Sequence, residues 1–144
     1  MRIGEIASQI GTDVETVRYY ERIGLLDEPE RNSSGYRQYA VSHQERLQFI
    51  RRCRSLQMSI SDIRTLLGLK NEPAAACEGV DDLLDHQIER VRQQLESLQQ
   101  LKEQLITLRC QCRQPHSVQE CAIIKNLSAQ ANDQAGACPA DELP

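Results

Sequence analysis

The sequence predicts a mainly α-helical protein, in which a winged helix-turn-helix unit precedes one long helix suited to dimerisation. Three observations favour this fold. The 144 residues include one Phe, four Tyr and no Trp, so the core must consist mostly of aliphatic side chains, as in packed helices. Short segments of helical periodicity, separated by turn residues, fill the first half of the chain. Apolar residues then recur at seven-residue intervals through residues 80–113.

A helix-turn-helix is expected at the start of the chain. Apolar residues at helical spacing occupy residues 3–10, and Gly11 follows as a stop signal. Residues 12–15 match a capping box, in which a hydroxyl and a carboxylate satisfy the free N–H groups of a new helix. The second helix is therefore expected over residues 14–23. Two short helices so close together are typical of a helix-turn-helix.

A wing and two further helices complete the domain expected over residues 1–70. Residues 27–36 are rich in turn-forming residues, and residues 36–39 alternate as in a short strand. A hairpin beside a helix-turn-helix is a wing. A second capping box at residues 42–45 is expected to begin a third helix, and Ser59 is expected to cap a fourth.

The longest periodic segment covers residues 80–113 and follows an expected linker at residues 71–79. Its apolar seam recurs every seven residues, at Leu84, Val91, Leu98, Leu105 and Cys112. Such a helix is about 50 Å long, too long to bury its seam on a domain this small, so it predicts pairing with the same helix of a second chain. Residues 114–127 are expected to form a loop and a short turn, and residues 128–144 a disordered tail.

Charge and composition narrow the function classes. The net charge is −4, but residues 1–70 carry a surplus of +2 and the remainder −6, so only the first half suits a polyanion. No apolar run of about 18 residues and no secretory signal is present, so a cytoplasmic location without membrane contact is expected. Six cysteines in the cytosol are expected to be thiols or metal ligands. The sequence contains no Walker motif, no HExxH motif and no nucleophile–base pair, so an enzyme is not expected.

Several motifs resemble those of the MerR family of transcriptional regulators. They are Ile3-Gly4-Glu5-Ile6-Ala7, Thr16-Val17-Arg18-Tyr19-Tyr20-Glu21, Gly24-Leu25-Leu26, Gly35-Tyr36-Arg37 and Tyr39. The resemblance extends to about residue 127 and implies a DNA-binding winged helix-turn-helix domain, a linker and an antiparallel coiled-coil homodimer. The expected DNA-binding residues are Val14, Thr16, Arg18, Tyr19, Tyr20, Tyr36 and Arg37. Further phosphate contacts are expected from Arg51, Arg52 and Arg54.

Three of the six cysteines predict a metal site. Cys77 precedes the long helix, whereas Cys112 and Cys121 lie at its far end, with a loop between them. Within one chain, about 50 Å of helix separates Cys77 from Cys112, so one ion cannot bind both. In an antiparallel dimer, the start of one helix lies beside the end of the other, and Cys77 of one chain meets the other two cysteines of its partner. The resemblance to MerR-type sensors of divalent thiophilic ions points to the same three positions.

Three thiolates suit a soft or borderline divalent ion as the effector. The segment that begins at Cys53 resembles the cadmium- and lead-responsive branch of the family, which favours Pb(II) or Cd(II), with Zn(II) or Hg(II) as alternatives. Zinc normally takes four ligands, and His116 or His86 is a candidate for the fourth. Cys53 itself is expected to be a buried apolar side chain, whereas Cys110 and Cys138 are expected to be bystanders or accessory ligands.

The expected role is that of a transcriptional activator. The resemblance implies a homodimer bound to an inverted repeat, within a promoter whose spacer is too long for RNA polymerase. Metal binding is expected to move the linkers and the DNA-binding domains, so that the double-stranded promoter DNA bends and untwists and the polymerase can use it. Two alternatives on the same fold remain open. One is cysteine oxidation as the signal, and the other is a bulky organic ligand, which usually requires a separate C-terminal domain.

Overall fold

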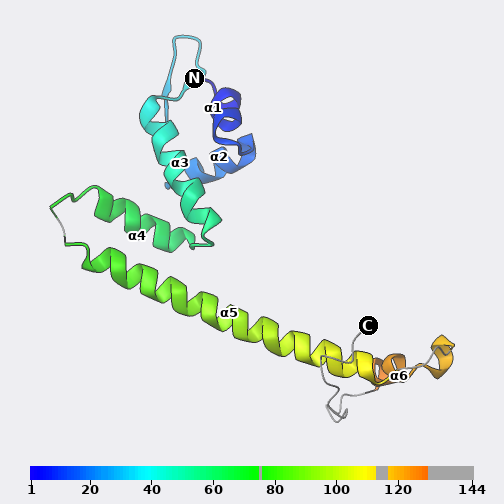
Figure 1. Cartoon of the computed structure of the whole chain (residues 1–144). Coiled ribbons are helices and arrows are strands. Elements are labelled where there is room, and N and C mark those ends of the chain that lie inside the picture. The colour runs from blue at the N-terminus through cyan, green and yellow to red at the C-terminus, as the bar shows by residue number, and fades with distance from the viewer. Residues whose placement is uncertain (75, 113–116, 130–144) are drawn as a thin grey trace. The chain divides into compact units, whose positions relative to one another are not determined.

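The computed structural model describes residues 1–74, 76–112 and 117–129 (Figure 1). The chain divides into two units, one covering Met1–Asp85 and one beginning at His86. The described residues are mainly helical, as predicted. Most of the expected tail lies outside the described residues, from residue 130 onward. In the described parts of the chain, no helix is both long and apolar enough to cross a lipid bilayer.

The first helix of the helix-turn-helix, α1 (Ile3–Ile10), ends where the sequence predicts. Gly11 adopts a φ of +76°, in the left-handed region that favours glycine. The N–H groups of Gly11 and Thr12 donate to the Ala7 carbonyl at 2.9 and 3.0 Å. These bonds satisfy a carbonyl that the end of the helix would leave without a partner.

The second helix, α2 (Val14–Arg22), begins as expected and ends one residue before the expected range of residues 14–23. The predicted capping box is wrong, because the cap is Asp13 and not Thr12. Asp13 Oδ1 accepts a hydrogen bond from the Thr16 N–H at 2.6 Å. A carboxylate accepts such a bond more strongly than a hydroxyl does, so the charged neighbour replaces Thr12 at the cap.

The wing is a two-stranded antiparallel sheet of β1 (Glu30–Arg31) and β2 (Arg37–Gln38). In its register, Glu30 lies opposite Gln38 and Arg31 opposite Arg37. The Asn32 side chain forms the turn between them, because its Oδ1 accepts from the N–H groups of Ser34 and Tyr36 at 3.0 and 2.9 Å. The predicted hairpin is confirmed, although its second strand is shorter than residues 36–39.

Two further helices follow the wing, α3 (Val41–Ser55) and α4 (Ile60–Lys70). The predicted cap of α4 is confirmed, because Ser59 Oγ accepts from the Asp62 N–H at 3.1 Å. The capping box predicted at residues 42–45 is wrong, since α3 already begins before it. At this helix start the Ala40 N–H donates to His43 Nδ1 at 3.0 Å, so an imidazole replaces the expected carboxylate.

Two apolar clusters form the core of the first unit. The first cluster comprises Ile6, Ala7, Ile10, Val17, Leu26, Tyr39 and Leu47. The second comprises Leu25, Ile50, Cys53, Met58, Ile63, Leu67 and Leu83. The first holds α1, α2 and the wing against α3, and Figure 1 shows these three helices side by side. The second joins the turn after α2 to α3, α4 and the beginning of the next helix.

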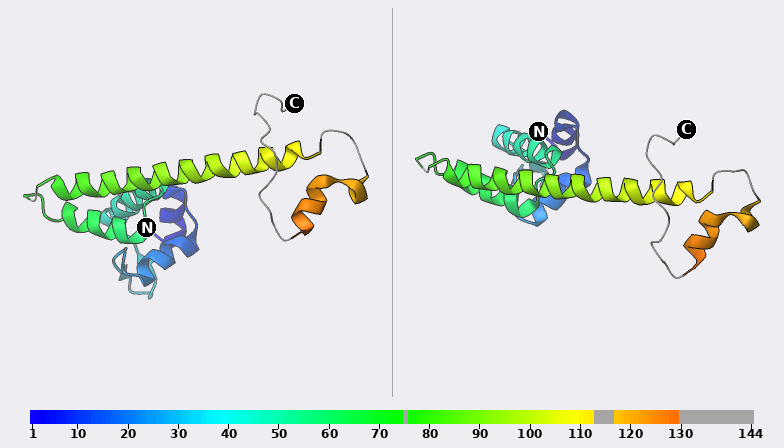
Figure 2. Two further views of the ribbon diagram at one scale, coloured as in Figure 1. Left: turned by 90° about the horizontal axis from the view of Figure 1, so that it is seen from below. Right: turned by 60° about the horizontal axis from the view of Figure 1, so that its bottom comes forward.

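That next helix, α5 (Glu78–Cys110), has 33 residues and is continuous in both views of Figure 2. Compared with the expected range of residues 80–113, it begins and ends earlier, so Cys112 follows the helix rather than lying on its seam. An apolar stripe along it is 39–62% exposed and comprises Leu84, Ile88, Val91, Leu95, Leu98, Leu101 and Leu105. A short 3-10 helix, η1 (Val118–Glu120), and a last helix, α6 (Ala122–Ser128), follow.

Candidate DNA interface and metal centre

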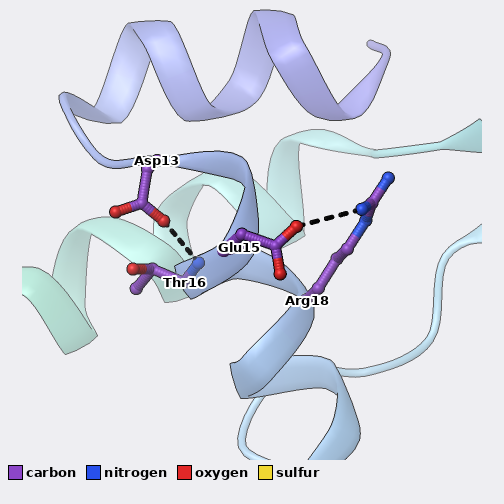
Figure 3. A network of polar contacts seen from close by, with 4 residues as sticks. All are labelled: Asp13, Glu15, Thr16 and Arg18. Carbon is purple, nitrogen blue, oxygen red and sulfur yellow. Dashed lines mark hydrogen bonds and ion pairs between the residues drawn. The ribbon is translucent and has the colours of Figure 1, made fainter.

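The outward face of α2 carries side chains that suit DNA. Arg18 and Tyr19 are exposed there, and the Arg22 guanidinium lies 5.6 Å from the centre of the Tyr19 ring. Arg18 also forms an ion pair with Glu15 at 3.2 Å, next to the N-cap of the helix (Figure 3). Both partners of this pair are largely exposed, so it stabilises the fold little. The Arg18 guanidinium therefore stays accessible to a phosphate or a base edge.

The remaining expected DNA-binding residues of α2 and the wing turn differ in burial. Tyr36 in the wing turn is 58% exposed, and the Arg2 guanidinium lies 5.1 Å from its ring centre. Val14 and Tyr20 instead pack partly against the core, and burial raises the pKa of the Tyr20 hydroxyl. Thr16 is half-buried beside its cap. Among these four residues, Tyr36 offers the largest accessible surface.

A carboxylate that the sequence patterns did not reveal lies between α2 and the wing. Glu21 Oε1 accepts a hydrogen bond from the Tyr39 hydroxyl, and Arg37 Nε lies 3.4 Å from Glu21 Oε2. Burial and the hydrogen bond to Glu21 raise the pKa of Tyr39. Arg37, an expected DNA-binding residue, is thus also paired within the protein. The sequence signal that could have revealed this contact is an acidic residue within a helix that is expected to face phosphates.

Two of the arginines expected to contact phosphates also donate hydrogen bonds to backbone carbonyls within the protein. Arg51 donates to the Ile10 carbonyl, the last of α1, and Arg54 donates to the Met58 carbonyl at 2.7 Å. Carbonyls in the last turn of a helix lack partners within it, so the Arg51 guanidinium satisfies the Ile10 carbonyl and offsets the negative end of the dipole of α1, whereas Met58 lies in the loop between α3 and α4. Arg51, Arg52 and Arg54 are all exposed, so the expectation that they contact phosphates stays a prediction.

Cys112 and Cys121 follow the end of α5, and their side chains are close enough for Cys112 to help lower the pKa of Cys121. Cys121 directly precedes α6, where the backbone N–H groups of Ile124 and Ile123 and the side chain of Cys112 favour its thiolate. These groups, Ile124 foremost, lower the pKa of Cys121 against the opposing effect of desolvation. The thiolate, which is the form that binds metal, is therefore present at lower pH here than at an ordinary cysteine.

The other expected ligands lie elsewhere. Cys77 is exposed and directly precedes α5, whereas His86 and Cys110 belong to that helix. Cys110 is disulfide-bonded, so the expectation that it is a thiol or an accessory ligand is wrong. Cys53 is buried, as expected, and burial raises the pKa of its thiol. Outside the described residues lie His116 and Cys138. Within the described part of a single chain, no three metal-ligating side chains gather at one place.

With its wing and the exposed arginine on α2, the first unit is a DNA-binding domain of the winged helix-turn-helix class. Residues 1–70 match the family model described as MerR HTH family regulatory protein, and residues 44–108 match the model described as MerR, DNA binding. The chain belongs to the MerR family of transcriptional regulators, as its motifs indicated.

Individual relatives match over most of the chain. The mercuric resistance operon regulatory protein of Bacillus cereus is 38% identical over 126 residues, which cover 88% of this chain and 96% of that protein. The HTH-type transcriptional regulator ZntR homolog of Haemophilus influenzae is 42% identical over 109 residues, or 76% of this chain and 81% of that protein. The transcription regulator PbrR691 from Ralstonia metallidurans CH34, in complex with lead(II), is 41% identical with a TM-score of 0.78, covering 88% of this chain and 98% of that chain. This chain is accordingly a metal-responsive transcriptional regulator and not an enzyme.

Proposed function

We propose that this protein is a cytoplasmic homodimer that senses Pb(II) or Cd(II) and activates a promoter by deforming its DNA. Each of two metal sites would consist of Cys112 and Cys121 from one subunit and Cys77 of the partner subunit. The observation that carries the proposal is the proximity of the Cys112 and Cys121 side chains, which would supply two of the three sulfur ligands at one place.

The apolar stripe of α5 supports the dimer. Its seven side chains, from Leu84 to Leu105, are 39–62% exposed in the single chain. A stripe of this length is stable in water when another apolar surface covers it. The same helix of a second copy carries the same repeat and offers such a surface, as in a coiled coil.

The length of α5 supports antiparallel pairing. Cys77 precedes this helix and Cys112 follows it, and 33 residues at 1.5 Å each span about 50 Å. Thiols at that separation cannot bind one ion, and parallel pairing of two helices would keep them apart as well. Antiparallel pairing would bring Cys77 of the partner subunit to the Cys112–Cys121 pair.

The ligand set supports a soft divalent ion. Three thiolates suit lead, cadmium and mercury, whereas zinc usually takes a fourth ligand, for which His86 is a candidate within the described residues. The relative whose structure is in complex with lead(II) supports ranking Pb(II) ahead of mercury and zinc. Relatives named for mercuric resistance and as a ZntR homolog keep Hg(II) and Zn(II) as alternatives.

On the DNA side, the two-fold symmetry of the dimer would place two copies of α2 in successive major grooves of an inverted repeat, with the wings on the flanking backbone. Ligation by Cys77 would tie the segment before α5 to the thiol pair of the partner and so move the DNA-binding domains. The promoter would bend, and RNA polymerase could then use it without contacting the regulator, because the two proteins share only the DNA. The dimer shape that favours the bend must bind the metal more tightly than the resting shape does.

A metal titration of the reduced full chain tests the site. We expect a thiolate-to-metal absorption band that saturates at one ion per subunit. The variants Cys112→Ser and Cys121→Ser lose the band, whereas Cys53→Ser, the buried control, retains it. The apparent metal affinity rises with pH, because the thiols release protons on binding.

Two further measurements distinguish the proposal from oxidation sensing and from sensing of another metal. If no metal produces a band but peroxide converts the thiols to a disulfide and changes transcription, oxidation is the signal and the proposed site is wrong. If Hg(II) or Zn(II) activates a reporter promoter at concentrations at which Pb(II) and Cd(II) do not, the site is right and the metal assignment is wrong.

A further inference from the structure

Glu21 occupies an unexpected position for a residue of a DNA-binding helix. It lies near the end of α2, and its side chain is only 9% exposed. A carboxylate on such a helix repels phosphates and is costly to bury without partners. Its presence therefore calls for a role within the protein rather than a contact with DNA.

Both oxygens of this carboxylate are directed at the wing. The Tyr39 hydroxyl donates to Oε1, and Arg37 Nε lies 3.4 Å from Oε2. Arg37 belongs to strand β2, and Tyr39 follows that strand directly. Because the two wing residues bind one carboxylate, the side chain of Glu21 connects the end of α2 to the strand that carries Arg37.

Tyr39 is itself immobilised, so the connection is rigid. Its side chain is only 3% exposed and belongs to the first core cluster. Its N–H donates to the Met1 carbonyl at 2.7 Å, and its carbonyl accepts from the Met1 amino group at 3.0 Å. The carboxylate of Glu21 is therefore fixed by a buried hydroxyl, and its other oxygen holds Arg37 by an ion pair in which the buried Nε of Arg37 makes no hydrogen bond.

Arg37 retains part of its surface despite this pairing. Its side chain is 36% exposed, and the ion pair engages Nε, so the terminal amino groups still offer donors. A guanidinium held at one edge loses less freedom when its other edge binds a phosphate. Partial neutralisation by Glu21 also weakens its attraction to DNA of any sequence.

We propose that Glu21 is a positioning residue that fixes the wing arginine relative to α2 and thereby increases discrimination between the cognate DNA and other sequences. The proposal rests on the proposed DNA interface of α2 and the wing. Discrimination requires that the helix and the wing meet the duplex in one register. A released Arg37 would contact any phosphate within reach, which adds affinity without sequence information.

The test compares two duplexes of equal length. One is the sequence that the wild-type full chain selects from a random double-stranded pool, and the other is its scrambled version. In Glu21→Gln, we expect the ratio of the two affinities to fall about tenfold, the equivalent of one charge-assisted hydrogen bond. Affinity for the scrambled duplex is expected to stay the same or rise, because one negative charge is removed near the DNA.

Two further variants complete the design. Glu45→Gln makes the same charge change at an exposed position on α3 and is expected to keep the wild-type ratio. Tyr39→Phe removes the hydroxyl donor but leaves the Arg37–Glu21 pair, so its ratio is expected to fall less than that of Glu21→Gln. A role in folding alone would weaken binding to both duplexes together and lower the melting temperature, without a change in the ratio.

Arg18→Ala distinguishes this inference from the proposed function. If Arg18→Ala weakens binding to the selected duplex while Glu21→Gln keeps the wild-type ratio, the positioning role is wrong and the DNA interface stands. If Arg18→Ala binds the selected duplex as tightly as the wild type does, the interface itself is wrong. A reduced ratio in Glu21→Gln with retained scrambled-duplex affinity supports the positioning role.

Discussion

Gly11 occupies a turn that is both left-handed and crowded. Its φ is +76°, and a Cβ at this position would lie 3.1 Å from Arg51 Nη1. That same guanidinium nitrogen donates to the Ile10 carbonyl at the end of α1. A side chain at Gly11 would therefore meet backbone strain and disturb the hydrogen bond that satisfies the helix end.

Gly11→Ala is expected to lower the free energy of unfolding by about 1–2 kcal/mol, because an L-residue is strained at positive φ. Urea denaturation of the full chain measures this loss. Gly4→Ala is the matched control, since a Cβ at Gly4 in α1 meets no heavy atom within 4 Å. In a helix with ordinary φ the same change is expected to raise stability by about 0.5–1 kcal/mol. Equal losses in both variants would show that the turn geometry is not the cause.

At the scale of elements, arginine side chains connect helices by hydrogen bonds to backbone carbonyls. The Arg64 guanidinium on α4 donates to the Ile23 carbonyl at the end of α2, and the Arg46 guanidinium on α3 donates to the Leu25 carbonyl at 2.7 Å. These two bonds attach the end of α2 to α3 and α4. The surplus of arginine in the first half of the chain therefore serves the fold as well as any contact with DNA.

The stripe of α5 yields a prediction about assembly. Leu98 is 61% exposed in the single chain. If the stripe is a dimer seam, Leu98→Glu would bury a carboxylate among apolar groups, and we expect the dimer dissociation constant to rise by at least about 30-fold. Sedimentation equilibrium measures this change. Gln100→Glu also introduces a carboxylate, but on the opposite face of the helix, and should leave the dimer intact. Unchanged dimerisation in Leu98→Glu would exclude the stripe as the seam.

For the whole molecule, the range of an interaction decides how well the sequence predicts it. Helix α1 could be predicted because its apolar spacing and Gly11 are local signals. Two predicted capping boxes were wrong because neighbouring residues compete for the cap. Asp13 outcompetes Thr12 at α2, and His43 contributes at α3 where a carboxylate was expected.

Contacts between distant residues could not be predicted. The hydrogen bond from Arg51 to Ile10 joins residues 41 positions apart, and periodicity contains no information about such a pair. The same holds for Glu21 and Tyr39, whose contact depends on how the wing packs on α2. The proximity of Cys112 and Cys121 could be anticipated, since only eight residues separate them in the sequence. Their proposed partner, Cys77, lies at the other end of a straight helix, so its role depends on a second chain.

Mixed dimers provide the most direct test of a metal site shared between subunits. A chain with Cys77→Ser lacks one ligand, and a chain with both Cys112→Ser and Cys121→Ser lacks the other two, so neither variant alone forms a complete site. A mixed dimer, assembled by refolding both chains together and isolated through a different affinity tag on each, would contain one complete site. We predict that it binds one Pb(II) per dimer with the thiolate-to-metal band, where the wild type binds two. A mixed dimer without that band, or wild-type binding by the Cys77→Ser dimer, would contradict the account.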